Sequence, residues 1–328
     1  MSPGLAACLI EDRTGLEALG PSWWDLWRRS LGATPFQSPA WIIPWWTAFK
    51  PGRLATIAVR RAEQLVALAP MYLEEGALGR RLLPLGIGTT DYLDILLCKD
   101  VPGAGTALVR AIDELAPEWE SWELEELGSG AAALSLSLPP GWREECGEQS
   151  VSPILTLSRA EPIPPKKRRK LRMAEHRIAR RTGEVLPVGL AGLSSFIDDL
   201  VRLHRARWNS RGEAGAFAYD SVEEFHRTSL PRLMEAGLAR VSVLHMEGSV
   251  VGAYYGLHHG SRAYAYLGGF DPDFSFESPG TVLVGRAIDT AREEGATEFH
   301  FLRGREKYKY EWGAVDCWTR RRSIRRHG

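Results

Sequence analysis

The sequence is poor in cysteine, has no long apolar run and carries no net charge, and each of these absences excludes a class of protein. Only 4 cysteines occur among 328 residues, and no two of them form a CxxC pair, so we expect neither a disulfide framework nor a cysteine metal site. No run of about 18 apolar residues is present, so we expect no membrane-spanning helix. The 8 histidines include no HExxH motif, and we therefore expect no metal cofactor. Because 41 basic residues balance 41 acidic ones, general binding to nucleic acid is not expected either.

What is present indicates a folded, globular protein. Hydrophobic residues make up 44% and charged residues 25% of the chain, which is long enough for two domains. The N-terminus shows no basic region before an apolar stretch, so we expect no secretory signal. The scattered cysteines suit a reducing compartment, and together these features predict a cytoplasmic protein.

The most informative stretch combines a strand, a glycine pair and a helix. Residues Ala263–Leu267 alternate as a half-buried strand does. Gly268 and Gly269 follow, and such a pair suits a β-bulge or a close approach of the backbone to a ligand. Further along, Thr281–Glu294 has the periodicity of an amphipathic helix and ends at a glycine.

The loop before that helix is a candidate anion site. Ser278, Pro279, Gly280 and Thr281 open directly into the helix, so several backbone N–H groups should be unpaired and point forward. Phosphate commonly occupies such a position. Proline is also common at the first turn of helices in general. The loop alone is therefore consistent with an anion site and with an ordinary helix start.

Five segments carry a resemblance by their order and spacing, namely LGGFDP (267–272), SPGTVLVGRAI (278–288), FHFLRGREKYKYEWG (299–313), PFQSPAW (35–41) and DYLD (91–94). They resemble the GNAT N-acyltransferases, and most closely the CelD/BcsL-like branch, which is FemAB-like and built from tandem GNAT units. The resemblance implies an α/β (α+β) fold of tandem GNAT-like domains, each a mixed, mainly antiparallel sheet flanked by helices.

The resemblance also implies a co-substrate, acetyl-CoA or another acyl-CoA, and no metal. In GNAT folds a bulged strand receives the thioester, and the following loop and helix N-terminus hold the CoA pyrophosphate. Carried onto this sequence, the cofactor-binding residues are Leu267, Gly268, Gly269, Ser278, Gly280 and Thr281. Residues 277–281 keep only part of the commonest loop pattern of the family, Q/R-x-x-G-x-G/A.

An internal repeat is visible in the sequence. TALVRAID (106–113) matches TVLVGRAID (281–289) at an offset of 175 residues with one residue inserted. The hairpin expected over residues 54–73 matches residues 239–257 at an offset of 185, which places Ala67 on Gly252. Two matches in the same order predict a duplicated unit.

Prolines around residues 158–165 predict a domain boundary there. We therefore expect an N-terminal GNAT-like domain over 1–160 and a C-terminal GNAT acyltransferase domain over 161–328, beginning with a basic helix. The segment GSGAAALSLSLPP, which follows the last strand of the first copy, has no ionisable side chain, whereas the second copy has RGREKYKYEWG. The first domain is therefore expected to be non-catalytic.

Acyl transfer from a thioester needs an acid for the departing thiolate, a place for the amine proton and stabilisation of the oxyanion. By the resemblance, Tyr308 takes the place of the tyrosine that protonates the thiolate in many GNAT enzymes, and Tyr310 is the second candidate. Lys309 is a candidate for stabilising the developing charge. Asp271 is a candidate for accepting the amine proton, and it is equally interpreted as a turn and capping residue. If this segment is extended, both tyrosines share a face, whereas on a helix one of them points away.

The acceptor side has candidates in both halves. In the first half they are Asp91, Tyr92 and Asp94, which form either the wall of a cleft or a polar loop that caps a strand. In the second half they are His204 and Trp208, near the end of an amphipathic helix. His204 is either a base or a histidine satisfied within the core.

The basic segment PPKKRRKLRMAEHRIARR (164–181) has three interpretations. It is a solvated helix docked by a narrow apolar stripe, or a surface for CoA phosphates, RNA or an anionic glycan, or a nuclear-localisation-like run.

Together these features predict an acyl-CoA-dependent acyltransferase that acts on an amine or hydroxyl of a small-molecule, sugar or polysaccharide-related acceptor. One alternative is a FemAB-type ligase, whose donor is aminoacyl-tRNA. Another is a degenerate, non-catalytic GNAT pair that serves as a binding or scaffold protein. No nucleic-acid partner is expected outside the tRNA alternative.

Overall fold

A computed structural model describes residues 4–115, 118–157, 163–210 and 212–326. The chain divides into two compact units: unit 1 extends to Ser150 and resumes at Trp318, and unit 2 comprises Val151–Cys317. This differs from the expected division at 160/161, because the strand β16 (Trp318–Arg326) pairs antiparallel with β8 (Ser121–Leu127) of unit 1. The predicted α/β (α+β) class is confirmed.

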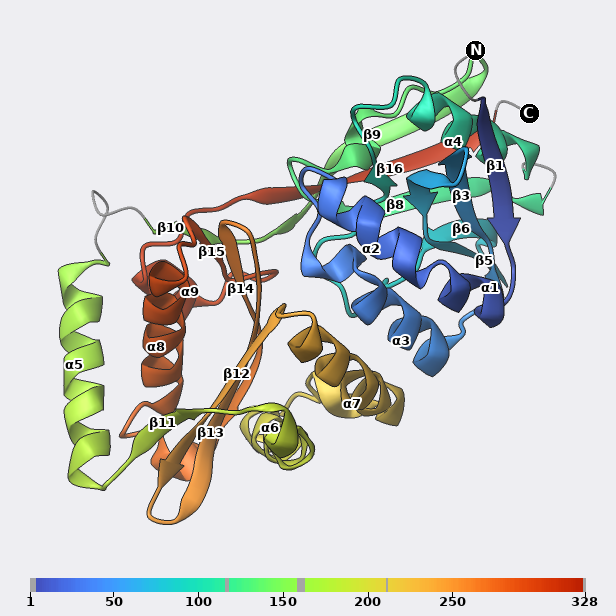
Figure 1. Ribbon diagram of the computed structural model, residues 1–328. Helices are drawn as coiled ribbons and strands as arrows, with labels where there is room; N and C mark the ends of the chain where they lie inside the picture. Colours follow the sequence, from blue (N-terminus) through green and yellow to red (C-terminus); the bar gives the residue numbers. More distant parts are fainter. Residues whose placement is uncertain (1–3, 116–117, 158–162, 211, 327–328) are drawn as a thin grey trace. The chain divides into compact units, whose positions relative to one another are not determined.

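Unit 1 contains an antiparallel sheet, a mixed sheet and helices on their surfaces (Figure 1). The sheet orders are β1-β3-β4-β7 and β2-β5-β6-β8-β16-β9. Its elements are β1 (Leu5–Ile10), α1 (Arg13–Ala18), α2 (Gly20–Arg29), η1 (Pro35–Gln37), α3 (Pro39–Phe49), β2 (Arg53–Leu54), β3 (Thr56–Arg61), β4 (Gln64–Ala69), β5 (Met71–Gly76), β6 (Gly79–Pro84), β7 (Leu96–Leu97), α4 (Ala104–Glu114), β8, η3 (Ala132–Ser135), β9 (Trp142–Val151) and β16. Its largest fully buried side chains are Trp23, Trp41, Trp45, Trp122 and Phe36, so tryptophan builds the core of this unit.

Unit 2 is one sheet in the order β10-β15-β14-β13-β12-β11, in which β14 and β15 are parallel and the other pairs that the structure describes are antiparallel. Its elements are β10 (Ile154–Thr156), α5 (Pro165–Arg180), β11 (Glu184–Pro187), η4 (Leu190–Gly192), α6 (Leu193–Asn209), η5 (Ala216–Ala218), α7 (Asp220–Glu235), β12 (Ala239–Met246), β13 (Ser249–His259), β14 (Arg262–Phe270), η6 (Pro272–Phe274), α8 (Pro279–Glu293), β15 (Glu298–His300) and α9 (Lys307–Glu311).

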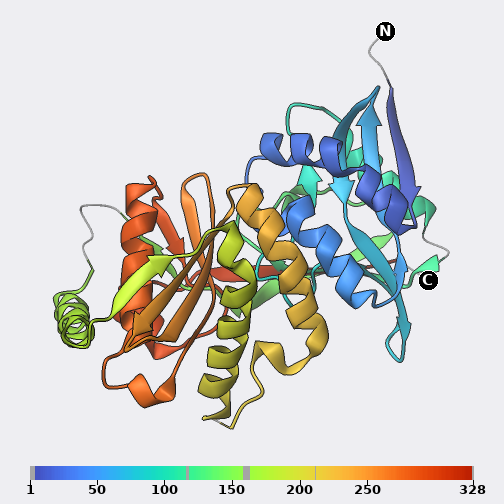
Figure 2. The same ribbon diagram turned by 60° about the horizontal axis from the view of Figure 1, so that its bottom comes forward.

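Helices cover both faces of this sheet. Figures 1 and 2 show α5 and α8 on one face and α6 and α7 on the other. Two glycines permit the close packing. A Cβ on Gly252 would lie 2.8 Å from the Leu283 side chain of α8, and a Cβ on Gly269 would lie 2.5 Å from the backbone nitrogen of His204 in α6. The sheet can therefore approach a helix on each side because these positions have no side chain.

The two units repeat one order of elements. In unit 1 the helices α1, α2 and α3 and the short strand β2 stand between β1 and β3, the hairpin β3–β4 follows, and β7 leads into α4. In unit 2 α6 and α7 stand between β11 and β12, the hairpin β12–β13 follows, and β14 leads into α8. The strand orders β1-β3-β4-β7 and β11-β12-β13-β14 correspond position by position. Unit 1 differs by a third helix, by the added strands β2, β5 and β6, and by β8, which joins a second sheet, whereas β15 of unit 2 pairs with β14.

The repeat extends to irregularities of the backbone. The hairpin ladder shifts register between Val59 and Arg60 in unit 1 and between Leu244 and His245 in unit 2, at the expected offset of 185 residues. Ala62 and Glu247, which keep that offset, are both left-handed with φ of 52°. Both residues are the first of a two-residue hairpin turn, where tight turns favour positive φ, so the two hairpins share their turn position as well as their register shift. The strand order and the register shift support the predicted duplication.

Candidate active site

A cavity of about 350 Å³ lies in unit 2 between strands β13 and β14, the first half of α8 and the short helix α9. We call it the first cavity. Six of its lining residues are the predicted cofactor-binding residues, namely Leu267, Gly268, Gly269, Ser278, Gly280 and Thr281. The structure thus brings the whole predicted set together at one place.

The strand beside the first cavity carries a β-bulge. Tyr255 pairs with Leu267, and the next pair is Gly256 with Ala265, so Tyr266 is the extra residue of β14. The bulge therefore lies just before the glycine pair that predicted it. At Gly269 the close approach is to α6 as well as to the cavity, because the nearest atoms to a Cβ there belong to Leu203 and His204.

The loop before α8 offers fewer free donors than the sequence led us to expect. Ser278 is left-handed with φ of 60°, and its N–H donates to the carbonyl of Ser275 at 3.2 Å. The N–H of Thr281 donates to the carbonyl of Ser278 at 2.9 Å, and Pro279 has no N–H. Of these four residues, Gly280 is left to donate to a ligand. The tight first turn of the helix is the physical reason for the difference.

Two cations also line the first cavity, and the candidate list from the sequence did not include them. Lys167 of α5 is 4% exposed, its Nζ lies 4.5 Å from the centre of the Trp312 ring, and it lies 3.5 Å from Glu311. Burial lowers the pKa of Lys167, while Glu311 opposes that shift. Arg207 of α6 stacks on Phe270 at 5.0 Å. The sequence offered one signal for each of them. Lys167 lies in the basic segment 164–181, and Arg207 lies in the segment LHRARW (203–208).

The two candidate tyrosines point to different surroundings. They lie on the helix α9, where residues two apart are separated by about 200°. Tyr308 lines the first cavity, and its ring lies 6.0 Å from that of Phe301. Desolvation, and after it a hydrogen bond to Asp316, raise the pKa of the Tyr310 phenol. Of the two, only Tyr308 is among the residues that line this cavity.

Lys309 is a structural residue, which corrects its assignment as a catalytic candidate. Its side chain is 2% exposed, and its Nζ donates to the carbonyls of Leu302, Arg303 and Gly304 at 2.9, 2.6 and 3.1 Å. Glu306 lies 2.9 Å away and balances the charge. A buried ammonium group needs such partners, and here they fix the loop between β15 and α9.

Neither Asp271, the candidate for accepting the amine proton, nor its neighbour Glu277 lines the first cavity. Asp271 caps the short helix η6 by accepting from the N–H of Asp273 at 3.0 Å, and it faces a separate hollow beside Arg202. Glu277 is buried and paired with Arg181 at 2.7 Å. No carboxylate is among the described residues that line the first cavity. The capping interpretation of Asp271 is therefore the one that the structure supports.

His204 is satisfied on both ring nitrogens. Its Nδ1 lies 3.3 Å from the carbonyl of Gly268, and its Nε2 accepts from the N–H of Ala216 at 3.1 Å. Burial lowers its pKa to about 4, so the ring is neutral and Nδ1 carries the proton. The histidine joins α6 to the bulged strand, with the ring of Trp208 5.8 Å away. Of the two interpretations of His204, a base or a histidine satisfied within the core, the contacts support the second.

The candidates in unit 1 form a capping loop. Asp94 accepts from the N–H groups of Ala132 and Ala133 at 2.7 and 2.9 Å, at the start of η3. Burial raises the pKa of Asp94 to about 7 although these bonds favour the carboxylate. The carbonyl of Tyr92 accepts from the side chain of Gln37, and Asp91 is nearly buried. A role of this trio in acceptor binding stays a prediction.

No helix in the part of the chain that the structure describes is long and apolar enough to cross a bilayer. No group of three or more histidine, cysteine, aspartate and glutamate side chains there is arranged to hold a metal ion.

Comparison with known proteins gives one sequence family and several similar structures. The model of the acetyltransferase (GNAT) domain family matches residues 165–310. FemX is similar with a TM-score of 0.63 and 13% identity over 97% of this chain and 96% of its own. L-PGS from Bacillus licheniformis has a TM-score of 0.58 and 15% identity over 97% and 93% of the two chains. No curated protein matches the sequence significantly.

A third structure is itself a tandem protein. The tandem GNAT protein from the clavulanic acid biosynthesis pathway has a TM-score of 0.52 and 14% identity over 99% of both chains. At these identities the likeness establishes the fold. Together with the repeat inside the chain, it confirms the predicted tandem GNAT architecture.

Proposed function

Because residues 165–310 are a GNAT acetyltransferase domain within a FemAB-like tandem GNAT fold, we propose that this protein is an acyltransferase whose donor is acetyl-CoA or another acyl-CoA. The acceptor group is an amine or hydroxyl of a small-molecule, sugar or polysaccharide-related compound in the cytoplasm. One observation carries the proposal. The first cavity gathers the six predicted donor-binding residues, a tyrosine and two cations at a bulged strand.

Donor binding rests on charge as well as on the helix start. The dipole at an exposed helix N-terminus contributes only about 0.3–1 kcal/mol, and the Gly280 N–H adds a single hydrogen bond. Arg207 and Lys167 line the same cavity and supply the positive charge that a pyrophosphate needs. Lys167 is held beside Trp312, so it is ordered before a donor arrives.

The chemistry follows from this arrangement. The acceptor nitrogen or oxygen attacks the thioester carbonyl carbon, and backbone N–H groups of Leu267–Gly269 stabilise the oxyanion. When the intermediate collapses, the carbon–sulfur bond breaks and Tyr308 gives its proton to the departing thiolate. Since no carboxylate is among the described lining residues, the acceptor's proton passes to water, and Tyr308 regains its proton from solvent. Unit 1 has no part in these steps and is proposed to be non-catalytic.

A second candidate donor is aminoacyl-tRNA, and the surface of α5 favours it. Lys166, Arg168, Arg169, Arg172 and Arg180 are exposed on this helix and form no ion pair with any residue that the structure describes. A row of unpaired cations is what an RNA backbone requires. Under this alternative the protein is a FemAB-type ligase.

Calorimetric titration of the purified protein with acetyl-CoA and, separately, with uncharged tRNA distinguishes these donors. We expect micromolar binding of acetyl-CoA and none of tRNA. The reverse result would replace the acyl-CoA proposal by the ligase. If the protein binds neither compound, the remaining interpretation is a degenerate, non-catalytic GNAT pair that serves as a binding or scaffold protein.

A further inference from the structure

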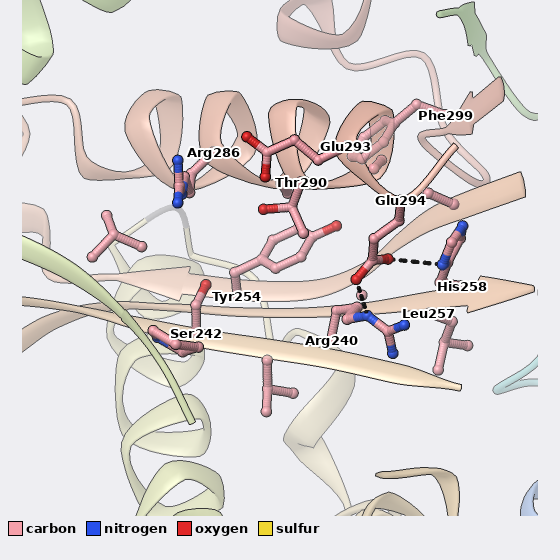
Figure 3. A pocket seen from close by; sticks show the side chains of 17 residues that line it. Arg240, Ser242, Tyr254, Leu257, His258, Arg286, Thr290, Glu293, Glu294 and Phe299 are labelled. Atoms are coloured by element: carbon pink, nitrogen blue, oxygen red, sulfur yellow. Dashed lines mark hydrogen bonds and ion pairs between the residues drawn. The ribbon is translucent and has the colours of Figure 1, made fainter. Parts of the chain in front are cut away.

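A second cavity of about 320 Å³ lies on the same face of the unit 2 sheet, beside the C-terminal half of α8 (Figure 3). It exists because small side chains face one another across the gap. They are Ser242, Gly256 and Ala263 from the sheet and Ala287, Thr290 and Ala291 from α8. Close packing would otherwise fill such a space.

The charged groups of the second cavity are at its rim and are neutralised or solvated. Glu294 binds Arg240 at 2.7 Å and the Nδ1 of His258 at 2.8 Å, as the dashed lines in Figure 3 show. Arg286 and Glu293 are exposed to solvent. The interior therefore needs no charged ligand for compensation, and its small apolar walls suit a hydrocarbon chain.

Tyr254 lines both cavities and stands between them. Its side chain is directed along β13, and its hydroxyl occupies the space above Gly256, where a Cβ would lie 2.5 Å from the oxygen. Figure 3 shows the ring between α8 and the sheet, as one of the side chains that line the second cavity. Burial and the neighbouring Tyr308 both raise the pKa of this phenol. Tyr254 is therefore a neutral aromatic side chain, and it lies next to Tyr308, the proposed acid.

We propose that Tyr254 determines the length of the acyl group that the first cavity accepts, by closing that cavity against the second one. This inference rests on the proposed use of acyl-CoA. With Tyr254 in place, a short acyl group fits and a longer chain meets the ring. When the ring is shortened, the two cavities join and a medium-length chain enters the space beside Ala287 and Ala291.

The test measures the affinities of acetyl-, butyryl-, hexanoyl- and octanoyl-CoA by calorimetry. For the wild-type protein we expect no gain in affinity beyond the shortest chains. For Tyr254→Ala each methylene that enters the second cavity should strengthen binding about fourfold, and octanoyl-CoA should bind at least tenfold more tightly than acetyl-CoA. Tyr254→Leu, a milder change that also withdraws from Gly256, should show the same trend. Tyr254→Phe keeps the ring and should keep the wild-type profile.

A second substitution checks that the gain comes from this space. Ala287→Leu refills the second cavity, and in combination with Tyr254→Ala it should abolish the preference for long chains. A Tyr254→Ala or Tyr254→Leu protein that binds acetyl-CoA normally and still shows the wild-type profile would overturn the inference alone. A folded wild-type protein without affinity for any acyl-CoA would overturn the proposed function, and this inference with it.

Discussion

At the scale of single residues, the two tyrosines of α9 give the sharpest chemical test. Tyr308→Phe removes the proposed acid while leaving the first cavity in place, so the affinity for CoA should be unchanged and kcat should fall about 10²–10⁴-fold. The release of free thiol with an amine that the wild-type protein acylates measures this. Tyr310→Phe is the matched control, and its activity should stay near that of the wild type because Tyr310 bonds to Asp316.

The opposite result is informative. A fully active Tyr308→Phe protein beside an inactive Tyr310→Phe protein would transfer the role to the second hydroxyl. Full activity of the double variant would show that the thiolate leaves without a tyrosine acid.

Lys309 is expected to affect stability rather than chemistry. Lys309→Met leaves the carbonyls of Leu302, Arg303 and Gly304 without their buried donor, and the free energy of unfolding should fall by about 1–3 kcal/mol. Urea unfolding measures the loss, and Lys307→Met, at the exposed neighbouring position, should be nearly neutral. Unchanged stability together with lost turnover would restore Lys309 as a catalytic candidate.

Single residues also show what the sequence could not reveal. The six predicted cofactor-binding positions and Tyr308 line one cavity, and the sequence could place them together because their order along the chain fixes the strand, loop and helices that carry them. The roles of Lys309, Asp271 and His204 depend on which carbonyl or N–H group lies next to each side chain in space. Such contacts come from tertiary packing, and a residue type alone does not encode them. Lys167 was missed for the same reason, because one buried lysine is hidden among many exposed cations of the basic run.

At the scale of elements, the loop before α8 can be tested by blocking it. Gly280→Asp places a Cβ and a carboxylate where a pyrophosphate would contact the helix start, so the affinity for CoA should drop at least tenfold, about 1.4 kcal/mol. Calorimetry measures the drop. Gly20→Asp is the control, since it puts the same side chain at the start of α2 with no atom within 4 Å of its Cβ. An unchanged affinity in a folded Gly280→Asp protein would exclude this loop from the donor site.

Elements were predicted where a local pattern repeats. The hairpins, α4, α8 and the duplication followed from matching runs at fixed offsets. The inserted hairpin β5–β6 has no counterpart in unit 2, so the repeat could not reveal it. The helix α9 is only Lys307–Glu311, too short for periodicity to separate it from an extended segment. The partner of β16 lies far away in the sequence, and no local signal identifies it.

At the scale of the whole molecule, buried histidines predict how stability changes with pH. Burial lowers the pKa of His204 to about 4 and that of His226 to about 3, whereas an unfolded histidine has a pKa of about 6.5. The unfolded state therefore binds more protons below pH 6.5. The contribution of the two histidines to the free energy of unfolding should be fully present above that pH. It should fall as the pH decreases toward 4, by about 1.4 kcal/mol per pH unit for each histidine.

Urea unfolding at pH 7, 6 and 5 measures this slope. His226→Phe should make it shallower, and His176→Gln, an exposed position on α5, should leave it unchanged. Asp94 acts in the opposite direction, because its pKa of about 7 is raised and its contribution is lost as the pH rises through that value. A flat profile between pH 7 and 5 would contradict a neutral, buried state of the two histidines.

The return of the chain to unit 1 has a consequence for biosynthesis. In the sheet order β16 stands between β8 and β9, yet its residues follow those of the whole of unit 2. A ribosome that adds about 5–20 residues per second needs roughly 10–30 s to make unit 2. During that interval the nascent unit 1 presents two strand edges with a vacant place between them, and such edges invite pairing with other chains. The unit made first can close its sheet only after the unit made second has emerged, so a chaperone that shields this gap has its greatest effect in that interval.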